Sequence, residues 1–546
     1  MARDNERFGI SPGSYRVIEP VKVPPIKLFS TGINVMDGPK DIGETEAVDM
    51  ADVRTDKGGV GPERELVLFG DAIDASPILH VSSFDTPSGQ RIGLRMKAGS
   101  WERYNGRDWV TIPGTISGIP YMRLYTTVFK GLFIAANGRD RMLKWDGNPA
   151  HEVEPLSDEA PRARFVIRIG NRLLAAGIKL SSIADWSADE VAYSADDDIE
   201  EWTDVLEGAG SLIASPEGRS EGENGITGLS AMAQGAVLYR ERALVMISRT
   251  GVRAAPFRFQ TIDTAHGTKS PYSIANGGLA IGDFFLGFDH VVYHFDGQSP
   301  PVPIGLPIQP LLEQRITDLD DCVGFINPDR MEYCLMVPTQ ENNKPVLDEM
   351  YIFSIRDYLR KKKLNWRYRS LSVPGIADLI TTGGYPIKIP TNYVTVVDEY
   401  DDPLLDIVDD QDWIVDSLVQ QVASLGMFGT DLGNTYQVDE NRMLLEGFWL
   451  SKQFGQEHDD FTIDRIRLVA SATMLSYVGV SVTWDGGVTF TDEVEVRIEP
   501  SNRSAFSGSG WRVSTGRLFQ FRLRPLHGDA IVHEINVYGQ SRGRSA

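Results

Sequence analysis

The chain has 546 residues, of which 42% are hydrophobic and 24% are charged, an ordinary composition for a globular protein with a sizeable core. Its 76 acidic residues outnumber its 54 basic residues, and the net charge of −22 argues against a nucleic-acid binder that works through bulk positive charge. Only two cysteines occur, which excludes a disulfide scaffold and an all-cysteine metal cluster.

Residues 1–70 differ in composition from the rest of the chain. They are rich in proline at 20–25 and in glycine at 58–61, and apolar residues are sparse. This composition predicts an extended N-terminal docking arm that lies on other surfaces. The first residues lack the apolar core of a signal peptide, and the chain has no run of about 18 apolar residues. We therefore expect folding in a cytoplasm and no membrane span.

Residues 71–446 repeat a pattern of short apolar strands separated by glycine-containing turns. In Val291–Phe295, alternate residues share one face of a strand, and Asp296-Gly297 forms the turn. Similar hairpins recur about every 40–60 residues, the spacing of β-propeller blades. The pattern predicts an all-β protein built on a β-propeller with insertions. An irregular pair of β-sandwiches is the alternative.

Apolar residues recur at helical spacing in two segments, Pro310 to Leu319 and Asp410 to Leu425. We expect a short helix in each. The second segment belongs to an acidic stretch near 380–440, which we interpret as an insertion in the propeller.

Carboxylates gather in two runs, at 196–201 and 398–416. A solvated surface is the usual explanation of such runs. The functional alternative is a wall of negative charge that repels phosphates along a passage for DNA. The candidate channel-facing residues are Asp196, Asp197, Asp198, Glu200, Glu201, Asp398, Glu399, Asp401 and Asp402.

One basic cluster stands out in this acidic chain, with Arg367 and Arg369 close behind it. An acidic protein neighbour fits such a cluster better than nucleic acid does, because the surrounding charge is negative. The candidate partner-docking residues are Arg360, Lys361, Lys362 and Lys363.

Residues 447–546 return to dense strands, such as Leu518–Leu523, and predict a C-terminal β unit or a closure of the propeller. The segment 483–490 resembles an Asp-box, the [ST]-x-D-x-G-x-T-[WF] hairpin of sialidase-type propellers, in which the carboxylate binds backbone amides across the turn. We interpret this turn as structural. Its residues are Thr483, Asp485, Gly487, Thr489 and Phe490.

Most motifs for known catalytic and metal sites are missing from the sequence. HExxH and GxxxxGK[ST] do not occur, GxSxG matches at 218–222 and 539–543 without further support for a nucleophile, and the eight histidines are scattered. We therefore predict no catalytic residues, no metal and no cofactor, and we expect that the protein is not an enzyme.

Several segments follow one another in an order that resembles a known family. They are Gly32–Val35, Glu44–Ala47, Gly170–Leu173, Val191–Ser194, Leu238–Arg242, Gly267-Thr268, Tyr293–Gly297 and Thr515–Phe519. In this order they resemble the tail nozzle proteins of short-tailed bacteriophages, also called tail-hub, tail tubular or packaged-DNA stabilisation proteins. Ala51-Asp52-Val53 departs from the Asn-Val expected there, and 380–450 matches no known part of the family.

The resemblance implies a structural subunit of the virion tail, assembled in the host cytoplasm. Its members are propeller-based subunits, six around a channel, docked beneath the portal and adaptor ring. Tail fibres or spikes attach to their flanks, and a plug or needle closes the tip. They retain the packaged genome and conduct it during ejection, so DNA would pass without sequence-specific binding.

Two other functions remain open from the sequence. One is a sialidase-like propeller glycosidase or a carbohydrate-binding tail protein, which would need carboxylates and aromatic residues at the propeller mouth. The other is a β-rich scaffold or adhesin unrelated to viruses.

Overall fold

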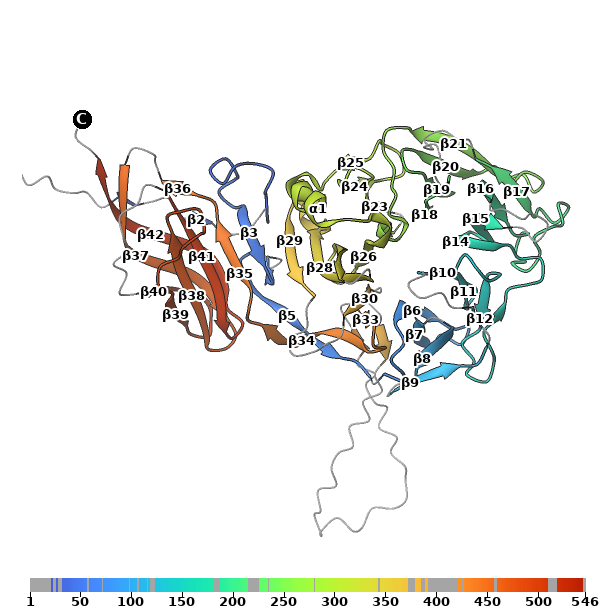
Figure 1. The fold of residues 1–546 in the computed structure, drawn as a ribbon, viewed down its shortest axis with the longest axis horizontal. Helices are drawn as coiled ribbons and strands as arrows, with labels where there is room; N and C mark the ends of the chain where they lie inside the picture. The colour runs from blue at the N-terminus through green and yellow to red at the C-terminus, as the bar shows by residue number, and fades with distance from the viewer. Residues whose placement is uncertain are drawn as a thin grey trace, which may run out of the picture.

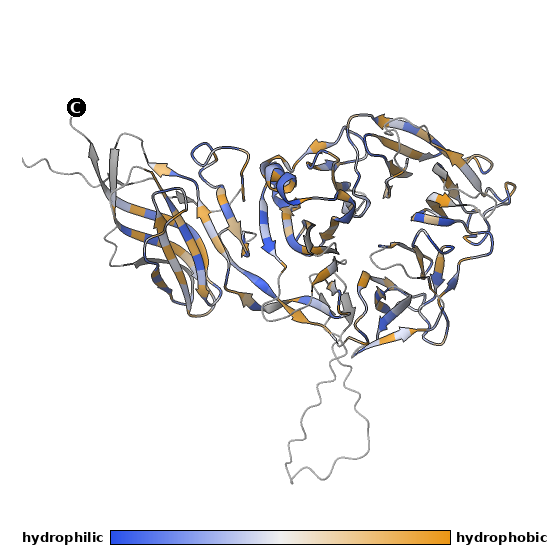
Figure 2. Ribbon diagram, in the orientation of Figure 1, coloured by the Kyte–Doolittle hydropathy of each residue, from blue (hydrophilic) through white to orange (hydrophobic). Residues whose placement is uncertain are grey.

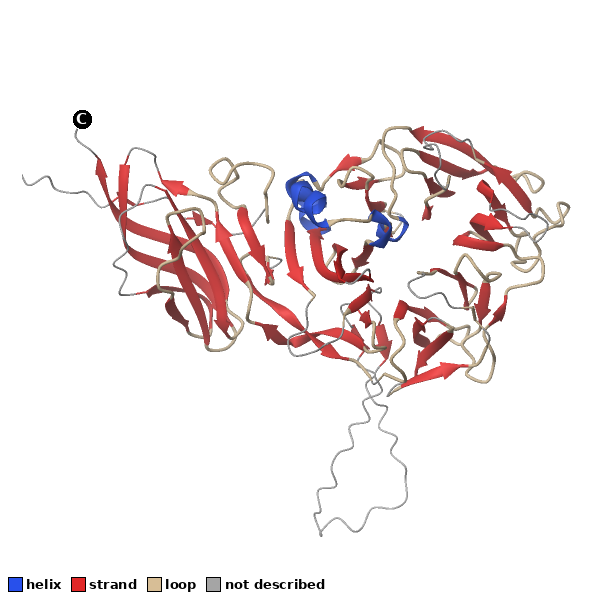
Figure 3. Cartoon of the chain, in the orientation of Figure 1, coloured by secondary structure: helices blue, strands red, loops and turns tan. Residues whose placement is uncertain are grey.

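The computed structural model describes residues 21–22, 26–27 and 32–543, with gaps. The gaps fall at 56–57, 71, 98, 106–107, 115, 118–122, 180–186, 215–224, 234, 279, 342–343, 372–378, 384–387, 391–420, 424–426, 456–458 and 509–517. Strands dominate the described residues and form a ring of sheets beside a second β unit (Figures 1 and 3). The predicted all-β propeller is confirmed.

Six four-stranded antiparallel sheets follow one another along the chain, and we number them as blades 1 to 6. Blade 1 comprises β6 (Ile78–Asp85), β7 (Arg91–Lys97), β8 (Ser100–Tyr104) and β9 (Trp109–Ile112). Blade 2 comprises β10 (Tyr125–Phe129), β11 (Leu132–Ala136), β12 (Leu143–Trp145) and β13 (Glu154–Pro155). Blade 3 comprises β14 (Arg162–Ile169), β15 (Arg172–Lys179), β16 (Ser187–Tyr193) and β17 (Gly210–Ile213).

The next three blades continue around the ring. Blade 4 comprises β18 (Gly228–Met232), β19 (Gly235–Tyr239), β20 (Leu244–Arg249) and β21 (Phe257–Asp263). Blade 5 comprises β22 (Ala275–Asn276), β23 (Asp283–Leu286), β24 (Val292–Phe295) and β25 (Val302–Pro303). Blade 6 comprises β26 (Val323–Asn327), β27 (Glu332–Glu341), β28 (Lys344–Ser354) and β29 (Trp366–Ser370).

Blade 7 closes the ring with strands from two distant parts of the sequence, in the order β30-β33-β34-β5-β4. They are β30 (Ile380–Gly383), β33 (Met427–Thr430), β34 (Thr435–Leu444), β5 (Gly61–Leu68) and β4 (Val53–Arg54). The short pair β31 (Lys388–Pro390) and β32 (Gln421–Ala423) flanks an interval that is not described. Blade 7 thus lies between blade 6 and blade 1 (Figure 1).

The second unit has two sheets whose inner faces share one core. The first holds β3 (Ala47–Ala51), β35 (Phe448–Ser451), β41 (Leu518–His527), β38 (Ser476–Thr483), β39 (Val494–Ile498) and β36 (Phe454–Gly455). The second holds β1 (Val21–Lys22), β2 (Ile26–Lys27), β42 (Ile531–Gly543), β37 (Asp459–Ala472) and β40 (Ser501–Gly508). We call this unit the sandwich.

Strands β3, β4 and β5 lie between residues 47 and 68 and belong to the two β units rather than to an arm beside them. Strand β3 joins the sandwich, and β4 and β5 join blade 7. The boundary predicted at residue 70 therefore falls beyond strands that the propeller needs for its closure.

Helices are short, as the turn-rich sequence predicts. They are α1 (Gln309–Arg315), α2 (Ile355–Lys361) and the 3-10 turns η1 (Pro271–Ser273), η2 (Leu306–Ile308) and η3 (Leu319–Asp321). The helix predicted from Pro310 is present as α1, with Leu312 buried. The helix predicted over Asp410 to Leu425 lies largely outside the described residues, and Gln421–Ala423 within it forms a strand.

Buried clusters lie between neighbouring blades, and Figure 2 shows apolar residues recurring along the strands of both units. Strand β24 illustrates the consequence. The sequence predicts one buried face, but all four residues of β24 are buried because blade 5 packs against a neighbour on each side. His294 lies in this interior, and its Nε2 is 2.7 Å from the Ile281 carbonyl oxygen.

Candidate functional site

Blade 7 is held to blade 6 by a buried network of charged side chains. Glu63 of β5 accepts hydrogen bonds from Arg367 and, at 3.4 Å, from Arg330. Arg367 Nη2 also donates to both carboxylate oxygens of Glu332 at 3.0 Å. Burial makes an ion pair costly unless each charge is matched and hydrogen-bonded, and here two guanidinium groups face two carboxylates. The network fixes where β5 docks.

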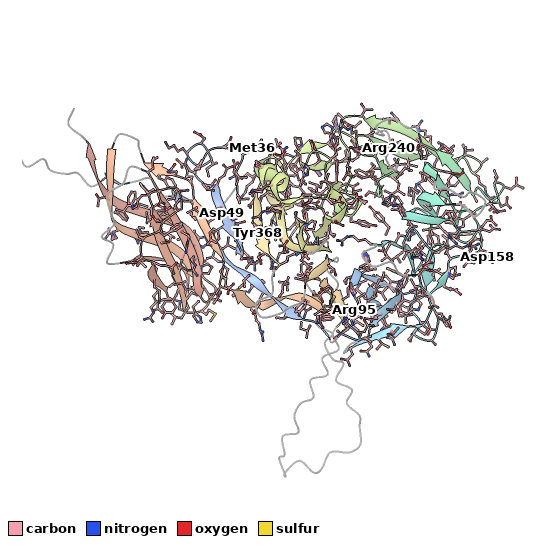
Figure 4. The ribbon with its side chains drawn as sticks, viewed as in Figure 1. Met36, Asp49, Arg95, Asp158, Arg240 and Tyr368 are labelled. Carbon is pink, nitrogen blue, oxygen red and sulfur yellow. The ribbon has the colours of Figure 1, made fainter. Side chains whose placement is uncertain are left out.

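A second buried cluster holds blade 7 to blade 1. Arg95 of β7 is hydrogen-bonded to Glu102, and its Nη1 donates to Thr435 Oγ1 of β34 at 3.0 Å (Figure 4). Lys97 Nζ lies 2.9 Å from Glu102 Oε1. Ion pairs thus join blade 7 to blade 6, and a hydrogen bond from a charged arginine to a threonine hydroxyl joins it to blade 1.

Arg367 and Arg369 therefore do not extend the basic surface cluster. Arg369 Nη2 donates to the Arg64 carbonyl oxygen at 2.8 Å, and burial lowers the pKa of Arg369 to about 10. Both arginines point into the contact between blades 6 and 7. The sequence does not separate them from Arg360–Lys363, because only the fold reveals that β29 is buried.

The N-terminal segment that resembles the nozzle family connects blade 6 to the sandwich. Ile33 N donates to the Trp366 carbonyl oxygen at 2.8 Å, and Ala47 N donates to the Gly32 carbonyl oxygen at 2.8 Å. Gly32 has a φ of +68°, and a Cβ there would lie 2.0 Å from the Trp366 carbonyl oxygen. Glycine is the residue that satisfies both requirements.

The Gly170–Leu173 segment also has a structural role. The buried Arg172 donates from Nη1 to the carbonyl oxygens of Ser194 and Gly208, at 2.6 and 2.7 Å. These bonds hold the loop between β16 and β17 against blade 3. That loop carries the first acidic run.

The acidic run 196–201 lies on the surface of blade 3, and two of its carboxylates reach blade 2. Lys130 Nζ lies 2.5 Å from Asp197 Oδ1, and Lys144 Nζ lies 2.5 Å from Glu200 Oε1. Lys144 is half-buried and the other three groups are exposed, so these surface pairs contribute little to stability.

The other three carboxylates of this run bond within the loop or to blade 3. Arg172 Nε lies 3.7 Å from Asp196 Oδ1, and Asp198 Oδ1 accepts the Glu200 amide at 3.0 Å. Glu201 Oε1 accepts the backbone amides of Thr203 and Asp204, which lower the pKa of Glu201. Asp398, Glu399, Asp401 and Asp402 lie outside the described residues. That either run faces a channel stays a prediction.

The basic residues 360–363 lie at the end of α2 on blade 6. Arg360, Lys361 and Lys362 are exposed, and Lys363 is half-buried. Lys361 Nζ is 3.8 Å from Asp357 Oδ1, and Lys362 Nζ lies 4.9 Å from the centre of the Tyr358 ring. Cations suit the negative end of a helix, so a local structural role accounts for part of the cluster. Docking of a partner here stays a prediction.

The Asp-box residues form a tight turn, and this turn lies between β38 and β39 of the sandwich rather than in a propeller blade. Asp485 accepts the amides of Val488 and Thr489 at 3.0 and 2.9 Å and the Thr483 hydroxyl at 2.7 Å. The hydroxyls of Thr483 and Thr489 hold the pKa of Asp485 far below its usual range. Gly487 has a φ of +94°.

Phe490, the last residue of the Asp-box, packs against the guanidinium group of Arg522. Its ring centre lies 4.4 Å from the guanidinium carbon of Arg522 on β41. The contacts of the whole turn are therefore internal to the sandwich.

A cavity of about 170 Å³ lies on the propeller axis, where the inner strands begin. Its lining includes His80 of β6, Arg123 and Tyr125 at the start of β10, and Tyr272 of η1. Arg123 spans the axis, because its Nη1 donates to the Thr381 carbonyl oxygen and its Nη2 to the Asp321 carbonyl oxygen, both at 3.1 Å. The lining contains no carboxylate. The sequence did not indicate this cavity, whose residues come from six blades.

Among the described residues, no group of three or more histidine, cysteine or acidic side chains is arranged to hold a metal ion. Over the same residues, no helix has the length and apolar character needed to cross a membrane.

Comparison with known proteins shows a similarity of fold alone. No family model and no curated protein matches the sequence. Solved structures with a similar arrangement include YCF48 bound to a D1 peptide, with 9% identity, a TM-score of 0.35, and coverage of 68% of this chain and 96% of that one. Another is an inactive virginiamycin B lyase from Staphylococcus aureus with quinupristin, with 7% identity, a TM-score of 0.38, and coverage of 69% and 99%. These similarities concern the β-propeller.

Proposed function

We propose that this chain is a structural subunit of a bacteriophage tail nozzle. Copies of it would form a ring around the DNA exit channel, retain the packaged genome and conduct it during ejection. The proposal rests on the resemblance of its ordered segments to that family, because the fold alone is shared by proteins of many functions.

One observation carries the proposal: the resembling segments occupy positions that hold the scaffold together. Gly32 and Ile33 tether blade 6 to the sandwich, and Arg172 anchors a loop of blade 3. Thr268 Oγ1 donates to the Leu286 carbonyl oxygen at 2.5 Å within blade 5. Similarity that concentrates at such joints favours a shared architecture over a shared catalytic site.

The propeller axis is not a route for nucleic acid in this proposal. Arg123 crosses it, and the cavity of about 170 Å³ suits only a small molecule. DNA would instead pass along the outer surfaces of subunits arranged in a ring, which is a heterologous assembly that closes on itself. The exposed acidic loop at 196–201 remains the described candidate for a surface that repels phosphates.

Partners would bind at the periphery. The exposed lysine-rich end of α2 offers a contact for an acidic neighbour, such as a subunit of the adaptor ring. Fibres or spikes and a closing plug or needle complete the assembly that the resemblance implies.

The proposal is tested by deleting the gene from the phage that encodes it. We expect particles with filled heads that lose their DNA after packaging, with complementation by the wild-type gene restoring retention. Stable, infectious particles without this chain would contradict the proposal.

A glycosidase is the second candidate, and the central cavity does not favour it. Its lining lacks the paired carboxylates of glycoside hydrolysis, and the Asp-box turn lies in the sandwich. Turnover of host polysaccharide by the purified chain, absent from a mock preparation, would favour this alternative.

A further inference from the structure

The central cavity combines one cation with apolar walls. Its polar side consists of Arg123, His80 and the tyrosines Tyr125 and Tyr272. Its apolar side includes Leu79, Leu124, Ile167, Leu229, Ile274 and Phe325. Such a pocket, apolar with a few converging polar groups, is the usual form of a small-molecule site.

Arg123 has hydrogen-bond donors to spare. Of its five N–H groups, the two that donate at 3.1 Å meet backbone carbonyl oxygens, and within the described part of the chain its guanidinium forms no ion pair with a carboxylate. The guanidinium carbon also lies 5.9 Å from the centre of the Tyr272 ring. Arg123 is half-buried, and the Asp321 carboxylate acts on it electrostatically without forming an ion pair with it in the described part of the chain. An anion in the cavity would pair with the guanidinium directly.

Among the side chains that line the cavity, Arg123 is the charged one. Burial and the charge of Arg123 lower the pKa of His80 to about 4, so His80 is neutral at pH 7. Its Nε2 is 3.3 Å from Thr126 Oγ1. The hydroxyls of Tyr125 and Tyr272 donate to the carbonyl oxygens of Pro271 and Arg123, at 2.7 and 3.1 Å, and burial raises the pKa of Tyr272.

The size of the cavity limits the ligand. At about 30 Å³ per water in the liquid, 170 Å³ accommodates about five water-sized groups. A planar carboxylate fits the fork of a guanidinium, and the apolar walls suit a short aliphatic tail. Phosphate or chloride would pair with the cation but leave the apolar walls unfilled.

We propose that the axial cavity binds a small aliphatic carboxylate, whose head group pairs with Arg123 and whose tail packs against the apolar side. Because Arg123 starts at blade 2 and donates to blade 6 at Asp321 and blade 7 at Thr381, the ligand would join three blades at the axis. It would therefore stabilise the closed ring.

Calorimetric titration of the full chain with butyrate at pH 7 tests the proposal. We expect saturable binding to one site, at least tenfold weaker binding of acetate, phosphate and chloride, and no binding of butyramide, which has the same shape without the charge. Butyrate should also raise the melting temperature. No saturable heat with butyrate, or equal heats with butyrate and butyramide, would overturn the proposal without any variant.

Variants then locate the site. Arg123→Gln should weaken butyrate binding at least tenfold, and Arg123→Lys should retain part of it. Arg91→Gln is the matched control, because Arg91 pairs with Asp85 at 2.7 Å on blade 1 and does not line the cavity. If Arg123→Gln melts as wild type does and binds butyrate equally well, the assignment to Arg123 is wrong. These outcomes are independent of whether the chain belongs to a phage tail.

Discussion

Glu63 and Arg367 lie 304 positions apart in the sequence and form a buried hydrogen-bonded ion pair at the contact between blades 6 and 7. Their side chains are 0% and 4% exposed, so water does not screen the interaction. Glu63 belongs to a strand that closes the propeller from the N-terminal side, and Arg367 belongs to the outermost strand of blade 6. This pair therefore couples the closure of the ring to the folding of the blade before it.

Removing Arg367 should strongly destabilise the protein. Arg367→Met leaves the buried carboxylates of Glu63 and Glu332 without the cation that they share, and breaking one partner of a buried pair costs about 3–5 kcal/mol. Urea unfolding followed by tryptophan fluorescence measures the change. Arg356→Met, at an exposed position on α2, is the control and should unfold like the wild type. Equal midpoints for the two variants would refute a stabilising role for the network.

Gly32→Ala should loosen the connection between blade 6 and the sandwich. The new Cβ would lie 2.0 Å from the Trp366 carbonyl oxygen, in addition to the cost of a φ of +68°. Gly58→Ala is a matched control, since Gly58 has a φ of +70° but no atom within 4 Å of the added Cβ. The φ cost alone is about 1 kcal/mol, so Gly32→Ala should lose clearly more stability than the control. Thermal melting and limited proteolysis near residues 32–47 compare the two, and indistinguishable behaviour would contradict the account.

Asp283 should make stability depend on pH. Burial raises the pKa of Asp283 to about 6, although hydrogen bonds from Tyr239, Ser230 and Asn276 partly oppose the shift. The folded pKa exceeds the ordinary value of 3.8, so the stabilising contribution of the protonated carboxyl is complete below that value and is lost as the pH rises through about 6.

The uncharged variant Asp283→Asn isolates this effect. The unfolding free energy of this variant relative to wild type should shift in its favour as the pH rises from 3.8, the ordinary pKa, through about 6, the pKa in the folded protein. Denaturant unfolding at several pH values measures the difference. Asp492→Asn, at an exposed position, should show no such trend. A constant difference for Asp283→Asn would show that Asp283 keeps an ordinary pKa.

The Asp-box turn should depend on the carboxylate of Asp485. Asp485→Ala removes the acceptor of the Val488 and Thr489 amides, so both amides should exchange faster with deuterium. Hydrogen exchange with mass spectrometry reads this directly, with Asp492→Ala as the control. Unchanged exchange at 488–489 would mean that the backbone alone holds the turn.

Local patterns in the sequence predicted much of the fold. The alternation in Leu518–Leu523 correctly places Phe519, Phe521 and Leu523 in a core, although Gln520 on the opposite face is buried as well. The same rule underestimates the burial of β24, because both faces of that strand are packed between blades. Alternation reports which residues share a face, but it does not report what covers the other face.

The sequence alone does not predict which strands pair to close the ring. The pairing of Glu63 with Leu444 in β5 and β34 joins segments that share no local signal. Likewise, Arg367 and Arg369 look like surface charges in the sequence, and only their partners on β5 and its neighbours explain their burial. The axial cavity is harder still to foresee, since six blades contribute only a few residues each to its lining.

The proposed function is tested most directly by immunogold labelling of intact virions of the phage that encodes this chain. The antibody would be raised against the purified full chain, and virions labelled with pre-immune serum would serve as the control. We predict gold at the tail tip, below the portal vertex of DNA-filled particles. Unlabelled tails, with the protein found free in the lysate, would contradict the nozzle assignment.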